Sequence, residues 1–491
     1  DGIGDLWGVL SKLDYIKSLN VDAIWFSPLY PSPNADYGYD ISDYMDIHPD
    51  YGNLEIFRKV LDEAHERGLR VFMDLVVNHT SDEHRWFIES RKSRDNPYHD
   101  YYYWRPARYV GKKRLPPNNW TSQFEGEAWE YDSDLDEYYL HLFARKQPDL
   151  NMDNPKVREE VKNIMRFWLD MGVDGFREDV ITYISKTPGL PSVYPKLPAA
   201  NGMQHYSNRP DVHRYLSEFR HDVLDNYDCF VVGESPLTNA DIALKYVTEG
   251  KDKVLDEMIA FSHMEADCFM TDFVPRPFSL RKMKKAFTTW QKKLEGRGWN
   301  ALYIENHDHP RIISRYGSEQ YWKESGKMLA AMYILQRGTP FVYQGQEIGM
   351  LNFALPRLDM YKDVMTFNAA RIASKLMPKS RVLKLINDRS RENARTPMQW
   401  SDEANAGFST VKPWFYVNSN YHTINVRTEE DDPDSILNFY RKVLKFKKET
   451  PAAIYGTYRE YMPKSDELYV YEREYGGGRV VKPLAITKLC S

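Results

Sequence analysis

The chain has little cysteine and no long apolar run. Its 491 residues include only three cysteines, Cys229, Cys268 and Cys490, an odd number at wide spacing. This argues against a disulfide framework and favours a reducing compartment, so we expect a cytoplasmic protein. No run approaches 18 apolar residues, so the sequence predicts no transmembrane helix.

An excess of one charge sign is also missing. The 66 basic and 71 acidic residues are well mixed and leave a net charge of −5. We therefore expect no nucleic acid and no membrane surface as a partner, but a monomer that acts on a small molecule. The 35 Tyr, 22 Phe and 12 Trp residues supply faces that stack on sugar rings, although such side chains more often fill cores.

Short apolar runs alternate with amphipathic segments, which is the pattern of βαβ units around a parallel sheet. The clearest helix begins with an Asn154 cap and Pro155 and ends at Gly172. Seven strand-like runs lie at 21–27, 70–77, 174–179, 230–234, 257–262, 301–305 and 340–343. We interpret the chain as an α/β protein with a (β/α)8 TIM barrel, whose first strand would precede residue 1 in a longer chain.

The pattern is interrupted once and changes near the end. Residues 79–140, rich in aromatic and polar residues, are too long for a simple loop and predict a domain inserted after strand 3. Residues 1–78 and 141–450 would then form the two parts of the barrel domain. Residues 451–491 carry strand signals at 455–461 and 468–473 but are too few for a stable sandwich, so they predict a truncated C-terminal β domain.

Polar residues end four of the apolar runs, at 78–79, 177–179, 234 and 306–308. An acid at one strand end could simply cap the next helix. Because the carboxyl ends of barrel strands meet on one face, four such ends favour an active site.

Glycoside hydrolysis needs such a set, with one ionised and one protonated carboxyl group. Arg177, on the same strand face as Asp179, would hold that carboxylate anionic. Glu234 ends an apolar strand, where desolvation would raise its pKa and keep it protonated. Asp308 would bind sugar hydroxyls and stabilise the positively charged transition state. For retention of configuration, the carboxyl oxygens of Asp179 and Glu234 should lie about 5–5.5 Å apart.

Four runs resemble, in order, the signature regions of glycoside hydrolase family 13, the α-amylase family: Val77-Asn78-His79, Asp174-Gly175-Phe176-Arg177-Glu178-Asp179, Gly233-Glu234 and Asn306-His307-Asp308. Residues 147–151 resemble the segment that marks its oligo-1,6-glucosidase, maltase and isomaltase branch. The similarity extends over nearly the whole chain and is closest to fungal and yeast α-glucosidases. It implies a retaining, exo-acting α-glucosidase of short oligosaccharides that needs no cofactor for catalysis.

The resemblance also implies which side chains serve the substrate. Asp179 would be the nucleophile, Glu234 the general acid/base and Asp308 the third acid. The substrate-binding residues implied by position are Asp36, Tyr39, His79, Phe143, Arg177, Val180, His307 and Arg391. Taken singly, several of these would be ordinary core or surface residues, and only the motif context selects them.

Three positions bear on linkage and on the type of reaction. Val180 resembles the valine that accompanies α-1,6 preference, although a valine in a buried strand is ordinarily packing. Glu178 and His309 depart from the family's usual apolar residue and glutamine, and His309 puts the linkage preference in doubt. Residues 312–316 lack the Arg/Asp-rich run of sucrose isomerases, which favours hydrolysis over isomerisation.

The start of the chain resembles the second half of a metal loop. Asp1, Ile3 and Asp5 alternate as oxygen donors to a hard cation do, which predicts a structural Ca²⁺ or Mg²⁺. The alternative is a solvated acidic turn before a helix.

Alternative functions remain within and outside enzymology. A glucosyltransferase or an α-1,4-preferring maltase would share these motifs, and product analysis separates them. A non-catalytic transporter heavy chain would carry a membrane helix and lack the intact acids. A barrel without its first strand would leave unpaired edges and an inactive chain.

Overall fold

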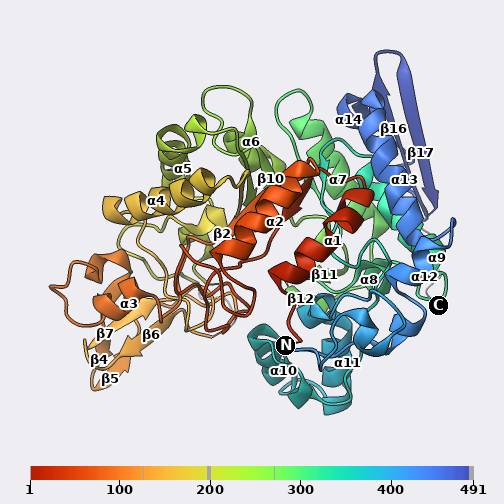
Figure 1. Cartoon of the computed structure of the whole chain (residues 1–491). Coiled ribbons are helices and arrows are strands. Elements are labelled where there is room, and N and C mark those ends of the chain that lie inside the picture. Colours follow the sequence, from red (N-terminus) through yellow and green to blue (C-terminus); the bar gives the residue numbers. More distant parts are fainter. Residues whose placement is uncertain (1, 125, 196–200, 270, 486–491) are drawn as a thin grey trace. The chain divides into compact units, whose positions relative to one another are not determined.

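The computed structural model describes residues 2–124, 126–195, 201–269 and 271–485. The chain divides into two compact units (Figure 1). Unit 2 comprises Asp22–Thr238 and Lys245–Met258, and unit 1 comprises Asp1–Val21, Asn239–Leu244 and Ile259–Ser491. Helix α6 (Ala240–Val247) has residues in both ranges.

A parallel sheet organises unit 2. Its strand order is β1-β2-β8-β9-β10, with β1 at Ala23–Trp25, β2 at Arg70–Leu75, β8 at Gly175–Glu178, β9 at Phe230–Glu234 and β10 at Glu257–Ile259. The pairs β1–β2, β2–β8 and β8–β9 are parallel. Strand β8 is buried along its whole length, because a parallel strand is covered on both faces. All five strands fall within the predicted runs, and most are shorter.

Helices α2 (Leu54–Glu66), α4 (Pro155–Met171) and α5 (Pro210–Asp222) belong to the same unit, and α4 and α5 lie side by side (Figure 1). Helix α4 begins and ends as the sequence predicts. The Asn154 side chain accepts a hydrogen bond from the Lys156 N–H, and Gly172 follows the helix with a φ of 106°. That conformation favours glycine because it has no Cβ.

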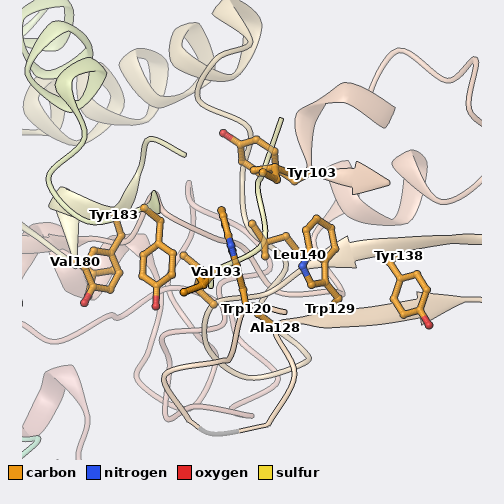
Figure 2. Close-up of a cluster of buried hydrophobic side chains, with 12 residues drawn as sticks. Tyr103, Trp120, Ala128, Trp129, Tyr138, Leu140, Val180, Tyr183 and Val193 are labelled. Atoms are coloured by element: carbon orange, nitrogen blue, oxygen red, sulfur yellow. The ribbon is translucent and has the colours of Figure 1, made fainter. Parts of the chain in front are cut away.

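The long connection after β2 forms small antiparallel elements. They are α3 (Arg85–Ser90), a β3-β7-β6 sheet (Trp104–Pro106, Glu137–Leu140, Trp129–Asp132) and a β4–β5 hairpin (Arg108–Val110, Lys113–Leu115). Its buried aromatic side chains pack with residues that follow β8 (Figure 2). Trp120, Trp129 and Leu140 share one cluster with Val180 and Tyr183. The segment therefore buries the residue next to Asp179.

Unit 1 contains a short parallel pair, β13 (Ala301–Leu302) with β14 (Thr339–Pro340), and a β11–β12 hairpin (Cys268–Phe269, Thr271–Pro275). Its helices are α1 (Leu6–Ser18), α7 (Leu280–Leu294), α8 (Ile312–Tyr316), α9 (Trp322–Ile334), α10 (Val364–Ala373), α11 (Lys379–Arg389), α12 (Val426–Glu430), α13 (Ile436–Glu449) and α14 (Pro451–Tyr455). An antiparallel sheet β15-β16-β17 (Thr457–Tyr461, Leu468–Tyr475, Gly478–Ala485) ends the described part of the chain. The sequence predicts its first two strands and misses β17.

Candidate active site

Four charged side chains from neighbouring strands gather in unit 2. Asp74 lies in β2, Arg177 in β8 and Glu234 at the end of β9, while Asp179 directly follows β8. The register pairs Asp74 with Arg177 across β2 and β8. Parallel pairing places the carboxyl ends of these strands at the same edge of the sheet.

The Arg177 guanidinium is the centre of this group. Its Nη1 donates to Asp74 Oδ1 at 2.9 Å and to Asp179 Oδ1 at 2.6 Å, and its Nη2 lies 2.8 Å from Glu234 Oε1. The Arg177 side chain is 1% exposed, and Asp179 and Glu234 are 7% and 5% exposed. The structure therefore brings Asp179 and Glu234 together on one buried cation.

The expected direction of the Asp179 pKa shift needs correction. Burial raises the pKa of the Asp179 carboxyl well above its usual range, and the Arg177 charge opposes this effect without overcoming it. Burial also raises the pKa of Asp74 to about 6. The physical reason is that one guanidinium faces three carboxyl groups, which would leave a buried net charge if all were ionised. Burial therefore outweighs Arg177 in setting the direction of the Asp179 pKa shift.

Val180 links the two acids through its backbone. Its N–H donates to Glu234 Oε2 at 3.1 Å, and its φ of 36° and ψ of 38° lie in the left-handed region. A β-branched residue is rarely found there, and such strain costs about 1–3 kcal/mol. Packing in the aromatic cluster of Figure 2 holds Val180 in this conformation.

A second polar group in unit 2 surrounds His79. The Gln147 Nε2 donates to Asp36 Oδ2 at 3.1 Å and lies 3.1 Å from His79 Nε2. Burial lowers the pKa of His79 to about 4, which keeps the ring neutral at neutral pH. The Phe143 ring lies 5.1 Å from the His79 ring.

Tyr39 contacts both groups, because its backbone makes a hydrogen bond with the His79 ring and its side chain reaches the Arg177 group. Its hydroxyl donates to Asp74 Oδ2 at 3.0 Å, and its ring centre lies 5.8 Å from the Arg177 guanidinium. Every substrate residue predicted in unit 2 therefore lies in or next to one of two hydrogen-bonded groups.

Asp308 lies in unit 1 with its own cationic partners. Arg391 Nη1 and Arg395 Nη2 donate to Asp308 Oδ1 at 3.1 Å and 2.9 Å, and His307 Nε2 lies 3.3 Å from Oδ2. Burial acts to raise the Asp308 pKa, but the charges of His307, Arg391 and Arg395 outweigh it and hold the pKa well below its usual range. Asp308 is therefore ionised.

Sequence reasoning missed several residues that hold the predicted ones in place. These are Asp74, Gln147, Asp149, Lys186, Asp363 and Arg395. Asp74 could have been found, because an acid inside an apolar strand run is unusual. Gln147 and Asp149 lie in the 147–151 segment that the family resemblance had already marked. For Lys186 the sequence offers no signal, because a lone lysine is usually a solvated charge.

The two departures from the family pattern are both buried. Glu178 is 1% exposed, its Oε2 has no hydrogen-bond partner within the described residues, and burial raises its pKa to about 8. His309 Nδ1 lies 2.7 Å from Asp272 Oδ2.

The predicted metal loop is described only in part. Asp1 lies outside the described residues. Asp5 caps helix α1, because its Oδ1 accepts a hydrogen bond from the Gly8 N–H at 2.7 Å. Ile3 is partly buried. One Asp5 oxygen and the Ile3 carbonyl fit the oxygen donor set of a hard cation.

No helix within the described ranges is long and apolar enough to cross a membrane.

Comparisons with known proteins give the family. Residues 1–456 match the model of the alpha amylase catalytic domain. The oligo-1,6-glucosidase of Parageobacillus thermoglucosidasius is 48% identical over 487 residues, which cover 98% of this chain and 86% of that protein. An alpha-glucosidase of Pediococcus pentosaceus is 44% identical over 488 residues, with 98% and 86% covered.

Solved structures agree. The trehalose-6-phosphate hydrolase of Bacillus licheniformis superposes with a TM-score of 0.93 at 40% identity, covering 99% of this chain and 87% of that one. The isomaltulose synthase of Klebsiella sp. LX3 gives a TM-score of 0.94 at 39% identity, covering 99% and 88%.

These matches confirm the predicted fold class, the (β/α)8 barrel, and the prediction of an enzyme. The relatives named here are bacterial, so the likeness to fungal and yeast enzymes stays a prediction. Because the family match spans most of its length, the chain belongs to the α-amylase family of glycoside hydrolases.

Proposed function

We propose that this enzyme is a retaining, exo-acting α-glucosidase that releases terminal α-linked glucose from short oligosaccharides. The observation that carries the proposal is the pair of acids, Asp179 and Glu234, held by the single buried guanidinium of Arg177. Retaining glycosidases need two carboxyl groups at short separation, one as nucleophile and one as acid/base.

The mechanism has two steps. Asp179 attacks the anomeric carbon and forms a glucosyl–enzyme ester while Glu234 gives its proton to the departing oxygen. Glu234 then takes a proton from water, whose oxygen attacks the same carbon and frees Asp179. Arg177 contacts both Asp179 and Glu234, so it stabilises the carboxylates that each step leaves behind.

Asp308 takes the third role, binding sugar hydroxyls and stabilising positive charge in the transition state. Its strongly favoured ionised form supports this assignment. The family motifs assign glucose binding to His307 and Arg391, and likewise to Asp36, Tyr39, His79 and Phe143. These roles follow from the family motifs and from the hydrogen-bonded groups around each residue.

The substrate is tested by product analysis. Wild-type enzyme should release glucose from isomaltose, and Asp179→Asn should lose this activity while keeping its thermal unfolding transition. Glucose release that survives in Asp179→Asn would refute the nucleophile assignment.

We propose α-1,6 linkage as the preferred one. Val180 supports it by its position beside the nucleophile, and a relative at 48% identity is an oligo-1,6-glucosidase. Val180→Thr should lower the ratio of kcat/KM for isomaltose to that for maltose. An unchanged ratio would contradict the role of Val180, and a wild-type preference for maltose would favour the maltase alternative.

Glucosyl transfer is the second candidate function. The similarity to an isomaltulose synthase favours it. In that reaction a sugar hydroxyl, instead of water, attacks the glucosyl–enzyme in the second step. Sucrose as substrate decides the question, because hydrolysis gives equimolar glucose and fructose whereas isomerisation gives a new disaccharide.

Further proposals concern the protein as a whole. We propose a monomer that does not bind nucleic acid, with the 79–140 segment as an inserted domain and a single structural cation near Ile3 and Asp5. The free thiols of Cys229 and Cys268 support a cytoplasmic location. Light scattering tests the first proposal, and a rise of Tm with added Ca²⁺ or Mg²⁺ that Asp5→Ala abolishes tests the cation.

A further inference from the structure

Lys186 is a buried lysine that the mechanism does not use. Its side chain is fully buried in the loop that follows Asp179. Its Nζ lies 2.7 Å from Asp149 Oδ2, donates to Asn78 Oδ1 at 2.9 Å, and lies 5.4 Å from the centre of the Tyr103 ring. Burying a lysine is costly unless its charge is paired and hydrogen-bonded.

Lys186, Asp149 and Asn78 form a closed ring of hydrogen bonds. Asn78 Nδ2 donates to Asp149 Oδ2 at 3.1 Å, and Asp149 Oδ1 accepts from the Leu142 N–H at 2.7 Å. Because Lys186 can only donate, Asn78 must present its oxygen to Lys186 and its amide nitrogen to the other side. The lysine therefore fixes which way the Asn78 amide points.

That amide nitrogen faces the glucose-binding histidine. Asn78 Nδ2 lies 3.2 Å from His79 Nδ1, and Gln147 Nε2 lies 3.1 Å from His79 Nε2. The Gln147 amide is oriented as well, since its Oε1 accepts from the Ala144 N–H at 2.9 Å. The Tyr39 backbone also makes a hydrogen bond with the His79 ring, and a neutral ring has only one accepting nitrogen, so only one of the two amides can donate to it. The orientations of the Asn78 and Gln147 amides therefore help decide which ring nitrogen carries the proton.

We propose that Lys186 is a positioning residue for glucose binding, which orients His79 through Asn78 and Asp149. It acts on the neutral ring and, through the 147–149 segment, on Asp36, without touching the sugar. This inference rests on the proposed α-glucosidase function and adds a residue that the family motifs quoted above do not include.

The test compares Lys186→Met with a matched control. Lys162 in α4 is another largely buried lysine of unit 2. Its Nζ lies 3.0 Å from Glu218 and 2.9 Å from Asp222, both in α5. Lys162→Met should lower Tm and leave the competitive inhibition constant of glucose unchanged. Lys186→Met should raise that constant and KM about tenfold, with a smaller change in kcat, because hydrogen bonds to the bound glucose are misplaced.

A Lys186→Met enzyme that loses stability but keeps the wild-type inhibition constant would overturn the proposal, since Lys186 would then only balance a charge. If Lys186→Met does not fold, Lys186→Met with Asp149→Asn removes the charge pair together. Weak glucose inhibition in that folded double variant supports the proposal, and wild-type inhibition overturns it. A wild-type enzyme that neither releases glucose from isomaltose nor binds glucose would refute the proposed function instead.

Discussion

Glu178→Gln should stabilise the protein progressively as the pH rises. Glu178 lies in β8 between two residues of the active-site group, is 1% exposed, and has a pKa of about 8 against an ordinary value of 4.5 because it is buried. The unfolded chain releases this proton above pH 4.5, whereas the folded chain keeps it until about pH 8. The free energy of unfolding therefore falls as the pH rises through this window and levels off above it.

The magnitude follows from the two pKa values. Compared with a side chain that does not titrate, Glu178 lowers the free energy of unfolding by about 3 kcal/mol at pH 7. At pH 5 it lowers this free energy by about 1 kcal/mol. The Glu178→Gln variant has no such dependence at this position. The difference in unfolding free energy between variant and wild type should thus grow by about 3 kcal/mol from pH 5 to pH 8.

Urea denaturation at pH 5, 6, 7 and 8 measures this difference. Glu429, whose pKa burial also raises to about 8, titrates in both proteins and cancels in the comparison. Any constant cost of burying the glutamine amide shifts all points equally. A difference that stays flat with pH would refute the reasoning, because it would mean that Glu178 is ionised in the folded protein.

Three further outcomes are expected. Asn154→Ala should lower the unfolding free energy by about 1 kcal/mol through loss of the α4 cap, whereas Asn154→Ser should keep most of it, and equal losses in both would contradict the capping role. Glu234→Gln should reduce kcat/KM for isomaltose at least about 100-fold but much less for p-nitrophenyl α-glucoside, whose leaving group needs no proton; equal losses would remove Glu234 from the acid role. Asp363→Asn should cost about 1–3 kcal/mol, because Arg391 loses its charged bond to Asp363 while it keeps Asp308 as a partner. Asp432 is partly exposed and pairs with Lys323, so it serves as the control, and Asp432→Asn should leave the unfolding free energy nearly unchanged.

The sequence predicted the parallel strands of unit 2 well because buried parallel strands are short apolar runs with polar ends, whereas β14 overlaps its predicted run 340–343 at Pro340 alone. β9 coincides with its predicted run, and α4 begins at the predicted cap because a cap and a proline at the first turn are local signals. β17 was missed because its neighbouring glycines and charged residues weaken the apolar pattern.

The electrostatics of the site were less predictable than its residues. Arg177 was expected to stabilise the charge of Asp179 alone, but its guanidinium also contacts Asp74 and Glu234. One positive charge therefore interacts with three carboxyl groups. That division depends on which strands lie side by side, and a single sequence does not reveal this. For the same reason the role of Lys186 could not be predicted. Its partners lie 37 or more residues away along the chain, and its burial depends on the tertiary fold.

The covalent intermediate tests the central claim most directly. With 5-fluoro-α-glucosyl fluoride as substrate, the 5-fluoro-glucosyl–enzyme ester should accumulate. The ring fluorine slows both steps, but the good fluoride leaving group keeps the first step fast enough for the ester to form. Digestion and mass spectrometry should then place the added mass on Asp179, and the first product of isomaltose should be α-glucose by NMR. A label on another side chain, or β-glucose as the first product, would contradict the account.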